Sequence, residues 1–169
     1  NQSAVIKKNA FTNCSSLKNV LLGKGEKPCQ IEIESHAFYK CKSLESIEFF
    51  SSIIKIGDNA FDECSSLNKV TFLYSINEIG NNAFNKCTSL KQIKIPLSVK
   101  KLGDNVFNEC TSLSDITISS SSINEIGNNA FNKCSSLKQI TIPSTVKEIG
   151  DNAFNECFLL NDIKIPCSV

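Results

Sequence analysis

Apolar residues recur along this chain in one fixed order, separated by short polar stretches. Around Leu90 the order is L-x-x-I-x-I, in which Ile93 and Ile95 stand two residues apart. Alternation of this kind is typical of a short β-strand with one buried face. A second apolar pair, Val99 and Leu102, follows each such strand and points back toward the core. The pattern therefore predicts units that each hold one strand and one return segment.

A phenylalanine followed three residues later by a cysteine marks every unit. These phenylalanines are 27, 23, 23, 23, 24 and 23 residues apart: Phe11, Phe38, Phe61, Phe84, Phe107, Phe131 and Phe154. The longer first interval contains an insertion at 23–30 that we expect to bulge at the surface. A period of about 23 residues is typical of solenoids, in which each unit buries its apolar face only against its neighbours. We predict a single repeat domain over residues 1–169, part of a longer chain, with about seven stacked coils.

The consensus of the units is V-x-x-I-G-x-N-A-F-x-x-C-x-S-L-x-x-I-x-I-P-x-S. The A-F-x-x-C-x-S-L part predicts a short helical turn with Phe and Cys facing inward. The recurrent glycine predicts a tight turn with positive φ, and the asparagine two residues later predicts a cap or a side-chain ladder between coils. A hydroxyl residue after each strand is expected to bond the following turn: Ser52, Ser75, Ser98, Ser121, Thr145 and Ser168.

Coils are also duplicated in pairs. Ser75–Pro96 and Ser122–Pro143 agree at 20 of 22 positions and differ only at Thr88/Ser135 and Lys94/Thr141. Duplication of this kind extends a surface, whereas an active site gains nothing from being copied.

The recurrent A-F-x-x-C-x-S-L-x-x-I-x-I-P set resembles the BspA-like leucine-rich repeats over the full chain. The resemblance implies an α/β leucine-rich-repeat solenoid. Its parallel β-sheet would line the inner face, and short helical or 3-10 turns with irregular return segments would form the outer face. It further implies a surface protein of the adhesin type.

Cysteines and the lone histidine are the residues that could carry chemistry. Seven of the nine cysteines occupy one inward column, and the chain contains no C-x-x-C pair that could begin a zinc site. We expect them to be free thiols packed as small apolar groups. Cys29 and Cys167 lie outside the column and are the only candidates for reactive or cross-linking thiols. His36 falls in the asparagine column and is expected to be structural, so we predict no catalytic residue, metal or cofactor.

Charge is balanced, with 18 Lys+Arg against 17 Asp+Glu. This argues against a nucleic-acid or anionic-membrane binder, which needs a basic surplus. No apolar run approaches membrane-spanning length, so we expect no direct membrane insertion in this segment. The residue before each column cysteine alternates in sign along most of the stack, which would place opposite charges on neighbouring coils: Glu63, Lys86, Glu109, Lys133 and Glu156.

A partner is expected on the outward side chains of the L-x-x-I-x-I strands. The predicted binding residues are Glu48, Phe50, Lys69, Thr71, Leu73, Tyr74, Gln92, Lys94, Asp115, Thr117, Gln139 and Thr141. Among them Phe50, Leu73 and Tyr74 would form an apolar ridge, the usual mark of a protein contact.

Two functions follow from these expectations. The first is a non-catalytic recognition module that binds a host, matrix or other surface protein, located at the cell surface or secreted as the resemblance implies. The alternative is an intracellular scaffold or a protein that assembles end to end. Nine cysteines without a clear disulfide pattern suit the reducing cytoplasm of this alternative.

Overall fold

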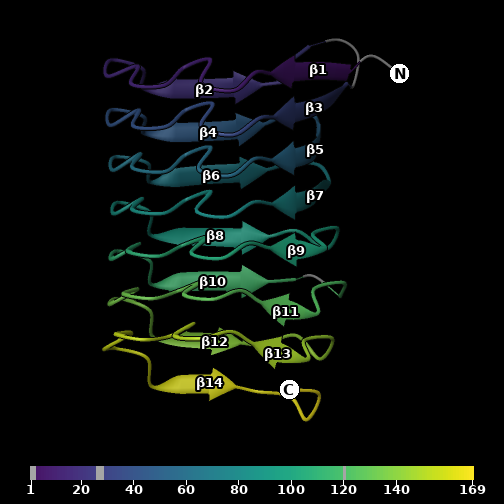
Figure 1. Ribbon diagram of the computed structural model, residues 1–169, viewed down its shortest axis with the longest axis vertical. Coiled ribbons are helices and arrows are strands. Elements are labelled where there is room, and N and C mark those ends of the chain that lie inside the picture. Colours follow the sequence, from purple (N-terminus) through teal and green to yellow (C-terminus); the bar gives the residue numbers. More distant parts are fainter. Residues whose placement is uncertain (1–2, 26–28, 120) are drawn as a thin grey trace.

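Seven coils stack into a parallel β-solenoid in the computed structural model, which describes residues 3–25, 29–119 and 121–169. Each coil contributes two strands, so the stack has two β-faces (Figure 1). The fold predicted from the repeat period is confirmed. The insertion at 23–30 falls partly outside the described residues.

The odd-numbered strands form one continuous seven-stranded parallel sheet in the order β1-β3-β5-β7-β9-β11-β13. Their bounds are Ser3–Ile6, Gln30–Ile33, Ser52–Ile56, Ile76–Ile79, Lys101–Leu102, Glu125–Ile126 and Glu148–Ile149. These strands occupy the segments that the sequence predicted to be irregular return paths, and that detail is wrong. The physical reason is spacing: Ile76 and Ile79 are both buried although they stand three residues apart, so the strand lacks the two-residue alternation.

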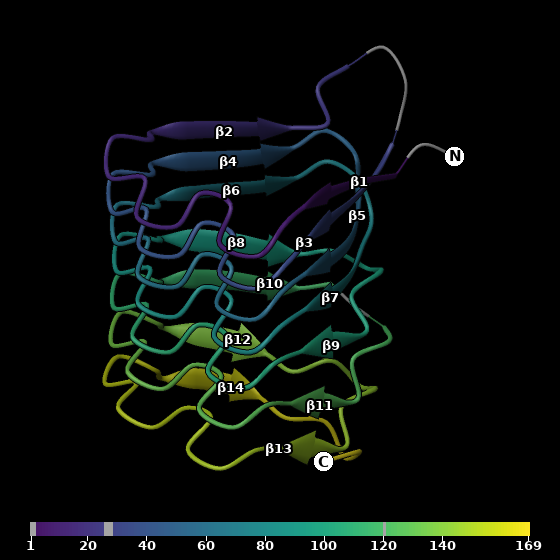
Figure 2. The ribbon, with the colours of Figure 1, turned by 45° about the horizontal axis from the view of Figure 1, so that its top comes forward.

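The even-numbered strands are the predicted L-x-x-I-x-I strands and lie side by side along the other face (Figures 1 and 2). Their bounds are β2 Asn19–Leu22, β4 Ser46–Phe49, β6 Lys69–Phe72, β8 Gln92–Ile95, β10 Asp115–Ile118, β12 Gln139–Thr141 and β14 Asp162–Lys164. They pair as three blocks: β2-β4-β6, β8-β10 and β12-β14. This face, here called the even face, is therefore interrupted between β6 and β8 and between β10 and β12.

The A-F-x-x-C segments form turns, and the described residues contain no helix. In one coil the backbone N–H groups of Asn82, Phe84 and Lys86 donate to carbonyl oxygens of the next coil at 2.8, 3.0 and 2.8 Å. These donors are therefore not available for hydrogen bonds within a helix. The predicted helical turns are wrong for this reason.

Positive φ occurs in each of these turns, but not at the recurrent glycine. In the same coil Asn82 (φ 55°) and Lys86 (φ 56°) adopt the left-handed conformation, and the equivalent residues of the other coils do the same. Asparagine tolerates this conformation better than most residues, which explains its column. The glycine column has another cause. A Cβ on Gly103 would lie 2.5 Å from the backbone N of Asn81 in the preceding coil.

The core consists of columns that run the length of the stack. Rings of the seven column phenylalanines stack at centroid distances of 5.0–5.6 Å, from Phe11 to Phe154. Such stacked aromatic pairs add to the stabilisation from burial. The Cys87 thiol donates to the carbonyl of Phe61 at 3.3 Å, and the column repeats this contact from coil to coil.

Candidate interaction surface

The even face carries the predicted partner-binding residues of the strands. Parallel register aligns them in two columns that run along the stack axis. Thr71 stands beside Glu48, Asp115 beside Gln92, and Thr117 beside Lys94. Most of these side chains are exposed, and Glu48 and Thr71 are half-buried. Asp162 and Lys164 on β14 continue the same two columns and are also exposed.

In the first block of the even face (β2-β4-β6), polar side chains on neighbouring strands pair with one another. Lys69 forms an ion pair with Glu48 at 2.5 Å, and the Ser46 hydroxyl donates to Asn19 Oδ1 at 2.7 Å. These contacts join β2 to β4 and β4 to β6. Side chains that hold one another in this way are less available to a partner.

Two depressions lie at the interruptions of the even face. The first, of about 280 Å³, borders the gap between β6 and β8 and includes Gln92 and Lys94. The second, of about 230 Å³, borders the gap between β10 and β12 and includes Gln139 and Thr141. Each of these two depressions is thus lined by residues from both sides of an interruption in the strand pairing.

An apolar ridge borders the even face where β6 and β8 end. Leu73 and Tyr74 follow β6 directly and are each 54% exposed. Phe50 follows β4 and is half-buried beneath Lys24, whose Nζ lies 5.8 Å from the ring centroid. Leu97, which sequence reasoning missed, follows β8 by two residues and is 67% exposed. The position of Leu97 in the repeat could have identified it, because it occupies the place that Tyr74 holds in the preceding coil.

Comparison with known proteins agrees with this geometry. The profile of the BspA type leucine rich repeat region matches in six copies over residues 1–79 and 66–169. The chain belongs to the BspA-type leucine-rich repeat family. No curated protein sequence matches the chain.

Solved structures of several bacterial leucine-rich repeat proteins are similar to this BspA-type chain. A leucine-rich cell-surface protein of Faecalibacterium prausnitzii is 35% identical with a TM-score of 0.71, over 86% of this chain and 42% of that protein. A T. pallidum leucine-rich repeat protein is 34% identical with a TM-score of 0.82, over 89% and 71% of the two chains. A Bacteroides ovatus leucine-rich repeat protein is 28% identical with a TM-score of 0.64, over 90% and 46%. The chain thus spans less than half the length of the first and third of these proteins.

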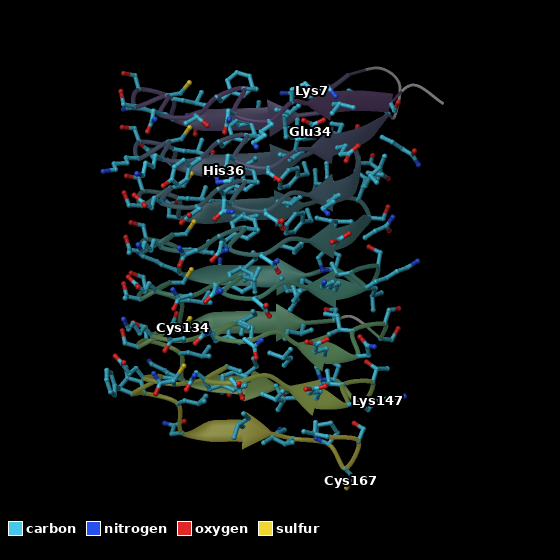
Figure 3. All side chains as sticks on the ribbon, viewed as in Figure 1. Lys7, Glu34, His36, Cys134, Lys147 and Cys167 are labelled. Atoms are coloured by element: carbon cyan, nitrogen blue, oxygen red, sulfur yellow. The ribbon has the colours of Figure 1, made fainter. Side chains whose placement is uncertain are left out.

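The cysteines of this BspA-type chain are all free thiols. Burial raises the pKa of the Cys87, Cys110 and Cys134 thiols, and it raises the pKa of the half-buried Cys157 to about 11. Thiols held protonated in this way are poor nucleophiles. The Cys29 thiol is half-buried, 3.6 Å from the Ser51 hydroxyl, whereas Cys167 is exposed beyond β14 (Figure 3).

His36 lies in the asparagine column with φ 60°, as its register predicted. Its ring packs edge-on against Tyr39 at a centroid distance of 5.3 Å, and its Nδ1 is buried without a hydrogen-bond partner among the described residues.

In the first two coils, the ammonium of Lys7 pairs with the carboxylate of Glu34 at 2.9 Å (Figure 3). Across the described residues no group of three or more His, Cys, Asp or Glu side chains could hold a metal ion. In the same part of the chain, no helix has the length and apolarity needed to cross a membrane.

As predicted, some of the alternating charges form ion pairs between neighbouring coils. Lys133 lies 3.8 Å from Glu109, and Lys40 extends the series by lying 3.9 Å from Glu63. Hydroxyl groups after the strands also bond the neighbouring coil. Ser98 Oγ donates to the Ile76 carbonyl at 2.9 Å, and Thr145 Oγ1 donates to the Ile123 carbonyl at 2.6 Å.

Proposed function

We propose that this chain is the non-catalytic recognition part of a cell-surface protein and that it binds a host, matrix or other surface protein. Leucine-rich repeat proteins generally serve protein interactions, and a related F. prausnitzii protein is described as a cell-surface protein. The observation that carries the proposal is the apolar ridge beside the polar even face. Exposed large apolar groups rimmed by polar ones are characteristic of protein contacts.

The ridge is tested by substituting Leu73, Tyr74 and Leu97 together with serine. Phe50 is left in place because it is half-buried and its loss would also affect stability. Binding of the purified chain to a panel of immobilised extracellular-matrix proteins is measured by surface plasmon resonance. We expect at least tenfold weaker binding for the ridge variant, the effect of losing about 1.4 kcal/mol of contact energy.

The matched control replaces Glu125 and Lys147 with serine. Both are exposed: Glu125 lies on β11, and Lys147, labelled in Figure 3, directly precedes β13. Both belong to later coils than the ridge residues, which follow β6 and β8. This variant is expected to bind as the unmodified chain does. Equal binding by the ridge variant, or no binding of the unmodified chain to any member of the panel, would refute the proposal.

The alternative is an intracellular scaffold or end-to-end assembly, and the free state of all nine cysteines favours it. Protease treatment of intact cells separates the two. A surface protein is digested while the cells remain closed, whereas a scaffold is protected until they are lysed.

A further inference from the structure

The apolar ridge and an exposed lysine meet at the interruption between β6 and β8. Leu73 and Tyr74 directly follow β6, and Leu97 follows β8 by two residues. The two strands lie in contact, although their backbones are not paired. The depression of about 280 Å³ at this interruption is lined by Val70, Gln92, Ile93, Lys94, Asp115 and Thr117. Its single ammonium group is that of Lys94, which is exposed.

Lys94 differs from the preceding lysine of the even face in having a free charge. Among the described residues Lys94 has no ion-pair or hydrogen-bond partner, whereas Lys69 pairs with Glu48. Asp115 lines the same depression but stands in the other outward column. The residue beside Lys94 in register is Thr117, whose hydroxyl can donate to the same acceptor as the ammonium. These two side chains thus offer two donors to one carboxylate.

The duplicated coils show that this lysine is not needed for the fold. The two 22-residue segments differ at two positions, Thr88/Ser135 and Lys94/Thr141. The first difference keeps its contact, because Thr88 Oγ1 and Ser135 Oγ each donate to a carbonyl of the preceding coil at 3.3 Å. The second replaces an ammonium with a hydroxyl on the even face. It is therefore the one change of chemistry between the two segments.

The ridge belongs to the same copy as Lys94. Tyr74 and Leu97 directly flank the first segment, and serines stand at both equivalent positions of the second. The depression at the second interruption does include Lys164, but together with two carboxylates. Because the buried residues of the two segments are identical, these exposed differences do not serve the packing of the core. They distinguish the two surfaces, as expected if Lys94 and the ridge form one site.

Strand geometry sets the distance between the two parts of this site. Lys94 and Pro96 stand two residues apart on the outward side of the chain, a separation of about 7 Å, and Leu97 follows directly. Leu73 holds the place of Pro96 one coil earlier. An extended segment laid along β8 also presents residues i and i+2 to one side, about 7 Å apart. Such a segment can place one side chain at the Lys94 ammonium and another on the ridge.

We propose that Lys94 and the apolar ridge bind an extended partner segment in which an Asp or Glu stands two residues from a large apolar residue. The carboxylate pairs with Lys94 and Thr117, and the apolar side chain packs on the ridge. This inference rests on the proposed recognition function and specifies the chemistry of its partner. Asp115 lines the same depression, so a doubly charged phosphate meets more repulsion there than a carboxylate does.

The test is the selection of random twelve-residue peptides, displayed on phage, on the immobilised 169-residue chain. We expect the bound peptides to be enriched in Asp or Glu two residues from Phe, Tyr, Leu or Trp. For one such peptide, replacing the acidic residue with its amide should weaken binding about fivefold in a fluorescence titration, the effect of losing one exposed ion pair.

Substitutions of two lysines locate the binding. Lys94→Thr copies the residue of the second segment and should remove the acidic preference while keeping the apolar one. Lys94→Glu should exchange the acidic preference for a basic one, because the site then carries a carboxylate. Lys164→Thr is the matched control, since it removes an exposed lysine at the equivalent position of β14, three coils beyond β8. It should leave the preference unchanged. Circular dichroism checks that all three variants fold.

No enriched peptide, enriched peptides without an acidic residue, or an acidic preference that survives Lys94→Glu would overturn the inference. These outcomes are distinct from failure of the proposed function. A chain that binds a matrix protein through the ridge but selects no acidic peptides refutes only this inference. A chain that selects such peptides but binds no matrix protein refutes only the matrix-binding role.

Discussion

Asp62 begins a row of side-chain amides that links the coils. Asn85 Nδ2 donates to Asp62 Oδ1 at 2.8 Å, and the row continues at 2.8–2.9 Å through Asn108, Asn132 and Asn155. Each interior asparagine both accepts and donates, which suits an amide and no other side chain of its size. Asp62 can stand only at the end, because its carboxylate accepts but does not donate.

The pKa of Asp62 is raised, mainly because its carboxyl is buried. The native chain then holds this proton to higher pH than the unfolded chain does, so the free energy of unfolding falls as pH rises through the interval between the two pKa values. Asp62→Asn removes this pH-dependent loss of stability, and its amide oxygen still accepts from Asn85 Nδ2. We expect the variant to be more stable than the unmodified chain at pH 7, by on the order of 1 kcal/mol, and nearly equal to it at pH 3, as measured by urea denaturation.

Asn108→Asp is the matched control within the same row. It leaves Asn85 Oδ1 without its donor, so we expect lower stability at pH 7 by about 1–3 kcal/mol. A destabilised Asp62→Asn variant at pH 7 would show that the carboxylate is preferred at the head of the row.

A side-chain ladder between coils was predicted for the asparagine column that contains Asn59 and Asn82. The residue directly before each of these asparagines forms such a ladder instead. Asp58 Oδ1 accepts from the backbone N of Asn81 at 2.8 Å, and Asn81 Oδ1 accepts from the backbone N of Asp104 at 2.9 Å. The asparagines that follow are present for their left-handed backbone. Sequence reasoning found the correct turn but assigned the ladder to its neighbour, because both columns contain Asn.

At the scale of the elements, close contact between coils explains the glycine column. A Cβ on Gly103 would lie 2.5 Å from the backbone C of Gly80 as well as from Asn81 N. We therefore expect Gly103→Ala to lower the free energy of unfolding by about 1–3 kcal/mol, the usual cost of overpacking. Thermal or urea denaturation measures the change.

Gly25→Ala is the control for this prediction, since a Cβ there meets no atom of the described residues within 4 Å. It should leave stability almost unchanged. Equal effects of the two substitutions would mean that backbone freedom, rather than contact between coils, determines where glycine occurs.

At the scale of the whole molecule, stability comes from contacts between neighbouring coils. Variants of the alternating charges test how much the ion pairs between coils contribute to that stability. Exposed ion pairs such as Lys133–Glu109 stabilise little, about 0–1 kcal/mol each. Reversing the sign of Lys40, Glu63, Lys86, Glu109, Lys133 and Glu156 together keeps every neighbour opposite. We expect the Tm of this variant to stay within about 2 °C of the unmodified chain, given that surface changes of this kind rarely exceed 0.5 kcal/mol.

Changing only Glu63, Glu109 and Glu156 to lysine places like charges on successive coils. We expect a lower Tm that recovers as salt is added, because exposed charges are screened over about 10 Å at 0.1 M ionic strength. An unchanged Tm at low salt would show that these charges do not interact along the stack.

The number of coils, the family resemblance and most of the inward columns could be predicted from the sequence alone. A residue such as Phe84 or Cys87 recurs at the coil period, and only the interior of a stack requires such repetition. The sequence also placed the columns of the even face, because residues that alternate with buried isoleucines must face outward.

Features that depend on contact between coils became apparent only in the folded chain. The seven-stranded sheet was hidden because Ile76 and Ile79 are spaced by three residues, and the left-handed turns were hidden because their hydrogen bonds run to the next coil. The structure also showed that Lys69 is paired with Glu48 whereas Lys94 has no ion-pair partner among the described residues, although both are exposed lysines on the same face. The pattern of apolar residues in the sequence indicates which side of its strand a residue faces. Its distance to the neighbouring residue on the next coil is set only when the coils stack.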